Sequence, residues 1–175
     1  RPHAGEGCAR VRMRGVARGR VPDGAEVRLV PVLWEGTDLR DCPLLAGSTS
    51  WALKPNNSSG AIILGPDGRA VAQLRQATRR WRTSEPGHYL GEWGYTQVPF
   101  RYVLEERLPG DRPPPEFKIF CFDGAPRFVQ VHRDRMTEAY SIATYDTRWH
   151  PLADHFVLGE PSPRPRPDNL DQILS

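Results

Sequence analysis

The two lysines of this 175-residue chain mark the places where its residue types best suit phosphate binding. Of 24 lysines and arginines, only Lys54 and Lys118 are lysines. Lys54 stands before the run Asn-Asn-Ser-Ser-Gly, whose small residues let backbone N–H groups approach an anion. An ammonium adds a compact charge for phosphate. The spacing is not that of a Walker loop, and a lysine before a polar turn commonly carries no function. The predicted phosphate-binding turn comprises Lys54, Ser58, Ser59 and Gly60.

Two adjacent carboxylates lie on a predicted strand in the segment Val-Leu-Glu-Glu-Arg-Leu. Because successive side chains of a strand point to opposite faces, Glu105 and Glu106 cannot share one surface. One of them can accept a hydrogen bond from a ligand amine. The backbone around Arg107 and Leu108 can pair with a purine edge. The alternative interpretation is an edge strand that its charges keep soluble.

The second lysine lies in the predicted strand Glu-Phe-Lys-Ile-Phe-Cys-Phe. Glu116 and Lys118 are two residues apart and therefore share one face of that strand. An acid and a base over one ligand is one interpretation, and a cross-strand ion pair is the other. Further along, Arg133 and Arg135 are predicted to share a strand face, where they could bind phosphate or carboxylate, or pair with nearby acids.

The remaining reactive side chains form no recognisable catalytic or metal-binding pattern. His132 has no Ser or Asp partner in the sequence, and no nucleophile elbow is present. Cys121 lies within an apolar strand and is predicted to belong to the core. Three widely spaced cysteines favour a reducing compartment, and the histidines lack zinc spacing. No apolar run reaches the roughly 18 residues of a membrane span, so we expect a cytoplasmic protein.

Positive charge is concentrated at the beginning of the sequence. The net charge is +3 and the sequence pI is about 9.0. Residues 1–20 hold six arginines against one acid, Glu6. Such an arm could bind nucleic acid. We favour a solvated terminus instead, because no aromatic residue lies between these arginines to stack on bases.

The periodicity and the turn residues predict an α+β fold with antiparallel strands. Segments 51–55 and 61–65 form a predicted hairpin with a polar tip. Segment 117–131 forms a second hairpin around Asp123-Gly124, a pair suited to positive φ. Single strands are predicted over 26–34 and 100–108, a loop or short helix within 145–152, and a helix start over 167–174.

A longer helix is predicted over residues 70–82. Apolar and small residues recur at intervals of three or four and define its core side. They are Val71, Leu74, Thr78 and Trp81. Four arginines mostly lie elsewhere on this helix and are interpreted as a solvated face. They are Arg75, Arg79, Arg80 and Arg82.

Taken together and in order, these motifs resemble the TupA-like family of the ATP-grasp superfamily. That family is associated with teichuronopeptide and polysaccharide biosynthesis and is often described as glycosyltransferase-like. It has a Lys-Pro-Asn-x-x-Ser-Gly hairpin, a Gly-Glu-Trp-x-Tyr flap, a Glu-Glu-x-Leu strand and an Asp-Tyr-Lys-Phe-x-Cys-Phe-x-Gly hairpin. The resemblance covers about residues 21–174 and is most specific over the last of these motifs. The matching stretches are 51–63, 91–108, 116–135, 145–152 and 165–174.

The resemblance implies an ATP site between two α+β lobes. Lys54 would contact the α- and β-phosphates beneath Ser58, Ser59 and Gly60. The segment from Glu105 through Glu106 and Arg107 to Leu108 would be a hinge that reads adenine. Glu116, where the family often has Asp, would reach the ribose hydroxyls. Lys118 would lie near the nucleotide, and Arg135 would hold phosphate or the carboxylate to be activated.

The implied reaction is carboxylate–amine ligation through an acyl phosphate, with Mg²⁺ at the transferring phosphoryl group. The acid and amine substrates are not indicated. The family's Mg²⁺ ligands follow the stretch that matches 165–174, so we expect a chain truncated at both ends that does not ligate by itself. The expected organisation is a basic arm (1–20), a partial ATP-grasp domain (21–160) and a Pro-rich connector with a helix start (161–175). A non-catalytic binding module is the alternative, followed by a nucleic-acid-binding protein.

Overall fold

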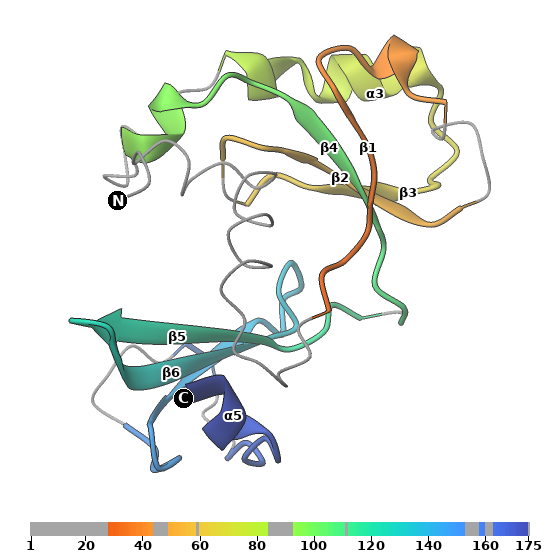
Figure 1. Cartoon of the computed structure of the whole chain (residues 1–175). Helices are drawn as coiled ribbons and strands as arrows, with labels where there is room; N and C mark the ends of the chain where they lie inside the picture. Colours follow the sequence, from red (N-terminus) through yellow and green to blue (C-terminus); the bar gives the residue numbers. More distant parts are fainter. Residues whose placement is uncertain are drawn as a thin grey trace. The chain divides into compact units, whose positions relative to one another are not determined.

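The chain folds into two compact units, Arg1–Arg107 and Leu108–Ser175. The computed structural model describes residues 28–43, 49–58, 60–83, 93–110, 112–152, 158–159 and 163–174. The predicted basic arm and Ser59 lie outside these residues. Antiparallel strands in two sheets, together with a few short helices, confirm the predicted α+β class (Figure 1). Among the described residues, no helix is long and apolar enough to cross a membrane.

The first unit contains a four-stranded antiparallel sheet in the order β1-β4-β2-β3. Its strands are β1 (Val32–Gly36), β2 (Trp51–Pro55), β3 (Ile63–Gly65) and β4 (Tyr102–Glu106). Pairing of β2 with β3 confirms the first predicted hairpin. The first strand begins later than predicted, at Val32. Pro31 has no N–H to donate, and its carbonyl accepts from Glu106 N–H at 3.0 Å.

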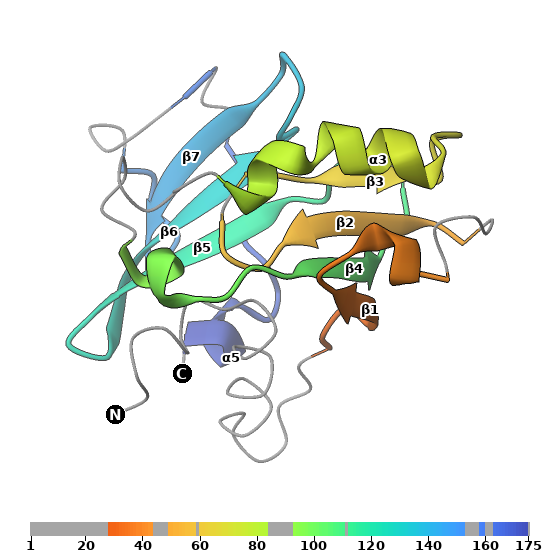
Figure 2. The same ribbon diagram turned by 90° about the horizontal axis from the view of Figure 1, so that it is seen from above.

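Three short helices accompany this sheet, and α3 covers one of its faces (Figures 1 and 2). They are η1 (Leu39–Asp41), α3 (Val71–Ala77) and η2 (Arg79–Arg82). A further 3₁₀ helix, η3 (Trp93–Gln97), precedes β4. The helix predicted over 70–82 is divided at Thr78, whose hydroxyl donates to Leu74 O at 2.8 Å and shares a 3.0 Å hydrogen bond with Tyr102 Oη.

The predicted core side of that helix is confirmed. Leu74 and Thr78 are fully buried, and Val71 and Trp81 pack against the same cluster. Because the residues at this spacing all meet the sheet, the apolar pattern predicted the buried face correctly even where the helix changes to 3₁₀ geometry.

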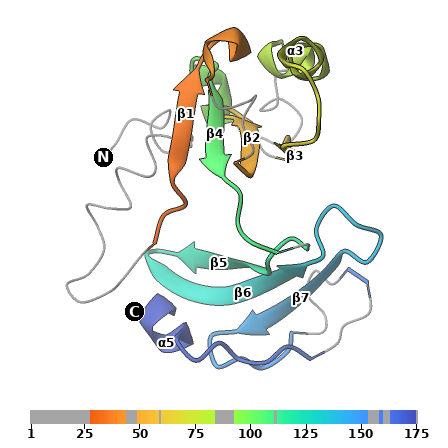
Figure 3. The same cartoon turned by 90° about the vertical axis from the view of Figure 1, so that its right-hand side faces the viewer.

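The second unit contains a three-stranded antiparallel sheet in the order β5-β6-β7 (Figure 3). Its strands are β5 (Glu116–Phe122), β6 (Ala125–Arg133) and β7 (Ser141–Asp146). Asp123 and Gly124 have φ values of 53° and 78°, which confirms the second predicted hairpin. The sequence did not predict β7, whose side chains are buried along most of its length.

The end of the chain is tied to this sheet through Trp149. Its ring stacks on Tyr145 with centroids 4.3 Å apart, and its Nε1–H donates to Arg164 O at 2.9 Å. Arg164 N–H in turn donates to Tyr145 Oη at 2.8 Å. The terminal helix α5 (Leu170–Leu174) begins two residues after the predicted cap and buries Leu170.

Candidate functional site

The strand register divides the side chains of β2 and β4 between two faces of the first sheet. Directly paired residues of antiparallel strands project to the same side. Leu53 and Leu104 are one such pair, and they belong to the core cluster that includes Leu74 of α3. Lys54 pairs with Val103 and therefore projects to the other side. Glu105, two residues after Val103, projects to that side as well.

Lys54 and Glu105 form an ion pair on the face of the sheet opposite α3. Lys54 Nζ lies 2.5 Å from Glu105 Oε2, and the side chains are 23% and 8% exposed. Glu106 is exposed on the other side of the strand. The prediction that the two glutamates point to opposite faces is therefore confirmed. The sequence did not show that Lys54 is the partner of Glu105, because β2 and β4 are separated by some fifty residues.

The turn that follows Lys54 is anchored by Asn56. Asn56 Nδ2 donates to Pro99 O at 3.0 Å, and Asn56 Oδ1 accepts from Arg101 N–H at 2.8 Å. Asn57 Oδ1 is buried, and no described residue donates a hydrogen bond to it. These two asparagines were missed as site residues. Their signal in the sequence is that a Lys-Pro pair ending a strand is followed by two amides.

Two predicted members of the turn occupy different surroundings. Ser58 is buried, whereas Gly60 is exposed with φ +81° and has open space where a Cβ would lie. Glycine adopts this left-handed backbone without strain. Ser58 and Gly60 thus lie close in sequence to Lys54, on a turn whose conformation at Gly60 favours glycine.

The predicted hinge residues lie where β4 ends and the second unit begins. Glu106 N–H donates to Pro31 O at 3.0 Å, and Arg107 N–H donates to Ser50 O at 3.2 Å. Leu108 is the first residue of the second unit, and this residue is 49% exposed. The two N–H groups that precede Leu108 are therefore already engaged by the sheet.

Glu116 and Arg135 form an ion pair in the second unit, with Arg135 Nη1 2.5 Å from Glu116 Oε2. The prediction that Arg133 and Arg135 share a strand face is wrong. Strand β6 ends at Arg133, and Asp134 adopts a left-handed backbone with φ 51°. The chain turns there, so Arg135 lies beyond the strand and reaches the carboxylate of Glu116.

Lys118 and His132 belong to the same face of the second sheet as Glu116. Glu116 pairs with His132 across β5 and β6, and Lys118 lies two residues further along β5. His132 is 4% exposed, and its Nδ1 lies 2.7 Å from Tyr140 Oη. Burial, together with the positive charges of Lys118 and Arg135, lowers the pKa of His132, and Glu116 partly opposes this.

The other predictions about reactive residues have mixed outcomes. Cys121 is exposed, so its predicted place in the core is wrong; of the two cysteines that the structure describes, Cys42 is the buried one. Cys121 does lie on a strand, β5, as predicted. At this end of the β5–β6 hairpin, however, the face that carries Cys121 is open to solvent. In the part of the chain that the structure describes, no group of three or more His, Cys, Asp or Glu side chains could hold a metal ion.

The candidate site residues therefore form two sets, each within one unit. The first unit holds the Lys54–Glu105 pair, the turn with Ser58 and Gly60, and the end of β4. The second unit holds Leu108, Glu116, Lys118 and Arg135. Comparison with protein families, curated proteins and solved structures found no match to this chain.

Proposed function

We propose that this chain binds ATP, as the nucleotide-binding part of an ATP-grasp-like carboxylate–amine ligase. The observation that carries the proposal is the Lys54–Glu105 ion pair on the face of the first sheet opposite α3. It places one ammonium, pre-oriented by a carboxylate, beside a polar turn that contains a left-handed glycine. Cell-envelope polysaccharide or peptide biosynthesis as its setting rests on the resemblance of the motifs alone.

The phosphate end of the nucleotide would lie over the turn after β2. Lys54 is partly exposed, so its ammonium can donate to a phosphate oxygen without leaving the neighbourhood of Glu105. The open space at Gly60 allows an anion to come close to the backbone. The buried Oδ1 of Asn57, to which no residue in the described part of the chain donates, is an acceptor and does not favour an anion, so we assign it to turn structure rather than to the phosphate.

The adenine end would lie where β4 leaves the sheet. With Glu106 and Arg107 N–H engaged, a purine edge there would meet the Arg107 carbonyl and the Leu108 N–H. Glu106 lies opposite Trp51 in the register, three residues from Lys54. At about 3.3 Å per residue the two ends are roughly 10 Å apart. A ligand that touches both must be elongated, as a nucleoside triphosphate is.

The second set of residues is assigned to the same ligand on the resemblance. Glu116 would accept from ribose hydroxyls, and Lys118 would lie near the nucleotide. Arg135, which now holds Glu116, would contact phosphate or the substrate carboxylate. Since each unit carries its own set, a variant in each unit tests the two contributions separately.

In the proposed ligation, a carboxylate oxygen attacks the γ-phosphorus and ADP leaves, and an amine then attacks the acyl carbon and releases phosphate. Positive groups stabilise the charge on the transferring phosphoryl group, and Lys54 and Arg135 are the candidates in this chain. The described residues do not fit a Mg²⁺ site by themselves. The proposal for this part of the chain is therefore nucleotide binding.

The test is calorimetric titration of the whole chain with ATP and GTP, each with and without Mg²⁺. We expect saturable 1:1 binding of ATP, with GTP at least tenfold weaker because the hinge backbone reads the adenine edge. Lys118→Ala, in the second unit, is expected to weaken ATP binding several-fold. Absence of saturable ATP binding in either condition would contradict the proposal. ATP binding without ADP release, once substrates are known, would identify a binding module.

A further inference from the structure

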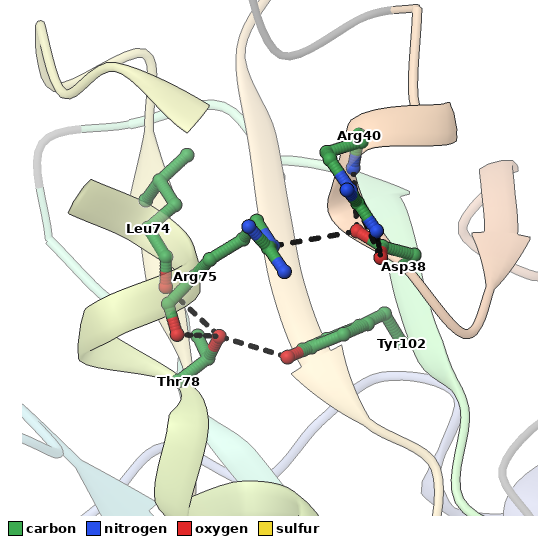
Figure 4. Close-up of polar contacts among 6 residues, drawn as sticks. All are labelled: Asp38, Arg40, Leu74, Arg75, Thr78 and Tyr102. Carbon is green, nitrogen blue, oxygen red and sulfur yellow. Dashed lines mark hydrogen bonds and ion pairs between the residues drawn. The ribbon is translucent and has the colours of Figure 1, made fainter. Parts of the chain in front are cut away.

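A pocket of about 140 Å³ lies on the face of the first sheet that α3 covers. Its lining combines the start of η1, the end of α3, η2 and the start of β4. Figure 4 draws the lining residues Asp38, Arg75 and Tyr102 with their polar contacts. Tyr102 projects to this face, whereas Lys54 and Glu105 project to the other. The pocket is therefore separate from the proposed nucleotide site. The lining residues are Asp38, Leu39, Arg75, Arg79, Arg82 and Tyr102.

Three of these six residues are arginines that recur at intervals of four and three along α3 and η2. This spacing brings Arg75, Arg79 and Arg82 to one side of the helical segment. Like charges at such intervals disfavour the helix slightly. Compensation of the helix dipole by basic groups near the end of α3 explains Arg75 and Arg79 in part. It does not explain why all three arginines line one hollow.

The single carboxylate of the pocket is already committed to other cations. Asp38 accepts from Arg40 Nη2 at 2.7 Å, Arg40 Nε at 3.1 Å and Arg40 N–H at 3.0 Å. Hydrogen bonds from Arg40 hold the pKa of Asp38 well below its usual range. Arg75 Nε reaches the same carboxylate at 3.4 Å. Three arginines and one aspartate are among the lining residues, so the residues of the pocket carry an excess of two positive charges.

The other two arginines keep donors available for a ligand. Arg82 lies over the rings of Phe100 and Tyr102, 5.5 and 5.8 Å from their centroids, which fixes the guanidinium plane without using its N–H groups. Within the described ranges, no acidic side chain forms an ion pair with Arg79. Tyr102 Oη is held by Thr78, so the aromatic wall of the pocket has a fixed position.

We infer that this pocket binds a phosphate group, either free or as the phosphomonoester of a small soluble molecule. Forked N–H donors from three arginines suit a tetrahedral dianion with several acceptor oxygens better than a carboxylate with one charge. The volume corresponds to only a few water molecules at about 30 Å³ each. It is also below the roughly 300 Å³ at which whole-ligand pockets begin. The pocket therefore takes the phosphate group itself.

The test is titration of the whole chain with inorganic phosphate and with methyl phosphate in chloride buffer of low ionic strength. We expect 1:1 binding that Arg79→Gln and Arg82→Gln each weaken at least tenfold. Arg80→Gln is the matched control, because Arg80 lies in η2 between these residues, carries the same charge and does not line the pocket. It should change the affinity less than twofold. Circular dichroism confirms that each variant is folded.

The two ligands distinguish the source of the phosphate. Binding of both supports a phosphomonoester ligand, and binding of inorganic phosphate alone supports the free ion. Equal weakening by Arg79→Gln and Arg80→Gln, or no saturable binding of either ligand, would overturn the inference. Binding of a DNA duplex to the chain that both variants weaken equally would also overturn the inference. That result would indicate a diffuse basic surface rather than a pocket. Arg79→Gln should leave ATP binding at the proposed nucleotide site unchanged. Failure of the phosphate proposal and failure of the ATP proposal can therefore be told apart.

Discussion

Lys54 and Glu105 face each other across β2 and β4, with 2.5 Å between Nζ and Oε2. The carboxylate is almost fully excluded from water, and the ammonium is partly exposed beside the turn that begins at Asn56. The carboxylate thus positions the lysine. In the proposed phosphate-binding role, this arrangement would account for a lysine here in a chain rich in arginine, because a slim ammonium fits between a carboxylate and a phosphate more readily than a guanidinium does.

The contributions of Lys54 and Glu105 to the free energy of unfolding should be strongly coupled. Lys54→Met leaves a buried carboxylate without its lysine, and we expect it to lower the free energy of unfolding by about 1–3 kcal/mol, less than for a fully buried pair because Lys54 is partly exposed. Lys54→Met with Glu105→Gln should cost less than the sum of the single variants. Urea denaturation of all four proteins measures the coupling.

The exposed Asp67–Arg69 ion pair is the control, and its two residues are substituted singly and together in a second double-mutant cycle. Its coupling should stay below about 1 kcal/mol, as is usual for surface pairs. Additive effects of the Lys54 and Glu105 substitutions, or an equal coupling in the two cycles, would show that the pair is not held as described.

Gly65 makes room for the buried ring of Trp51. A Cβ at Gly65 would lie 2.2 Å from Trp51 Cζ2, and Trp51 is 1% exposed, so the ring has nowhere to move. We expect Gly65→Ala to lower the free energy of unfolding by about 2–3 kcal/mol, the upper range for overpacking. The change in urea midpoint measures it, and near-ultraviolet circular dichroism reports the tryptophan environment.

Gly36→Ala is the matched comparison, because a Cβ there would meet Trp34 Cζ2 at 2.3 Å. Trp34 is only partly buried and can yield, so this substitution should cost less. If Gly36→Ala is as damaging as Gly65→Ala, the fixed position of Trp51 is not what makes glycine necessary at 65.

His132 should make stability depend on pH. Its pKa is lowered in the folded state by burial and by the charges of Lys118 and Arg135, with Glu116 opposing and Tyr140 at Nδ1. Below the usual value of about 6.5, the unfolded chain binds a proton that the folded chain does not. The free energy of unfolding therefore falls as pH decreases through that region.

The measurement is urea denaturation between pH 5.5 and 7.5 for the natural sequence and for His132→Gln. Most carboxylates stay ionised in this range, so the difference between the two proteins isolates the histidine. The natural chain should lose stability toward pH 5.5 more steeply than the variant. Parallel curves would mean that His132 titrates equally in both states.

Local patterns predicted most elements but few partners. The Asp-Gly turn requires positive φ and identified the β5–β6 hairpin, and the spacing of Leu74 and Thr78 identified the buried side of the helical segment. The alternation at Glu105 and Glu106 predicted which faces they take. These features depend on neighbours in sequence, so the sequence alone is sufficient for them.

The features that were missed depend on pairing between distant segments. Strand β7 became recognisable only beside β6, since its mixture of Ser, Thr and apolar residues lacks a clear period of two. The positive φ at Asp134 redirected Arg135 to Glu116, which strand alternation could not foresee. The predicted solvated face of the helical segment is confirmed, since Arg75, Arg79, Arg80 and Arg82 are all exposed. The sequence did not show the hollow beside Tyr102, which exists only after β4 packs under the helix.

In the proposed function, Lys54 contacts the phosphates of a bound nucleotide. The most direct measurement compares the dissociation constants of ATP and adenosine for the natural chain and for Lys54→Gln, with Arg79→Gln and Arg69→Gln as controls. A charged hydrogen bond is worth about 1.5–3 kcal/mol, so ATP affinity should fall at least tenfold in Lys54→Gln. Adenosine affinity should change less than twofold, and the controls should bind both ligands as the natural chain does. Unchanged ATP affinity in Lys54→Gln, or an equal loss for ATP and adenosine, would contradict this account.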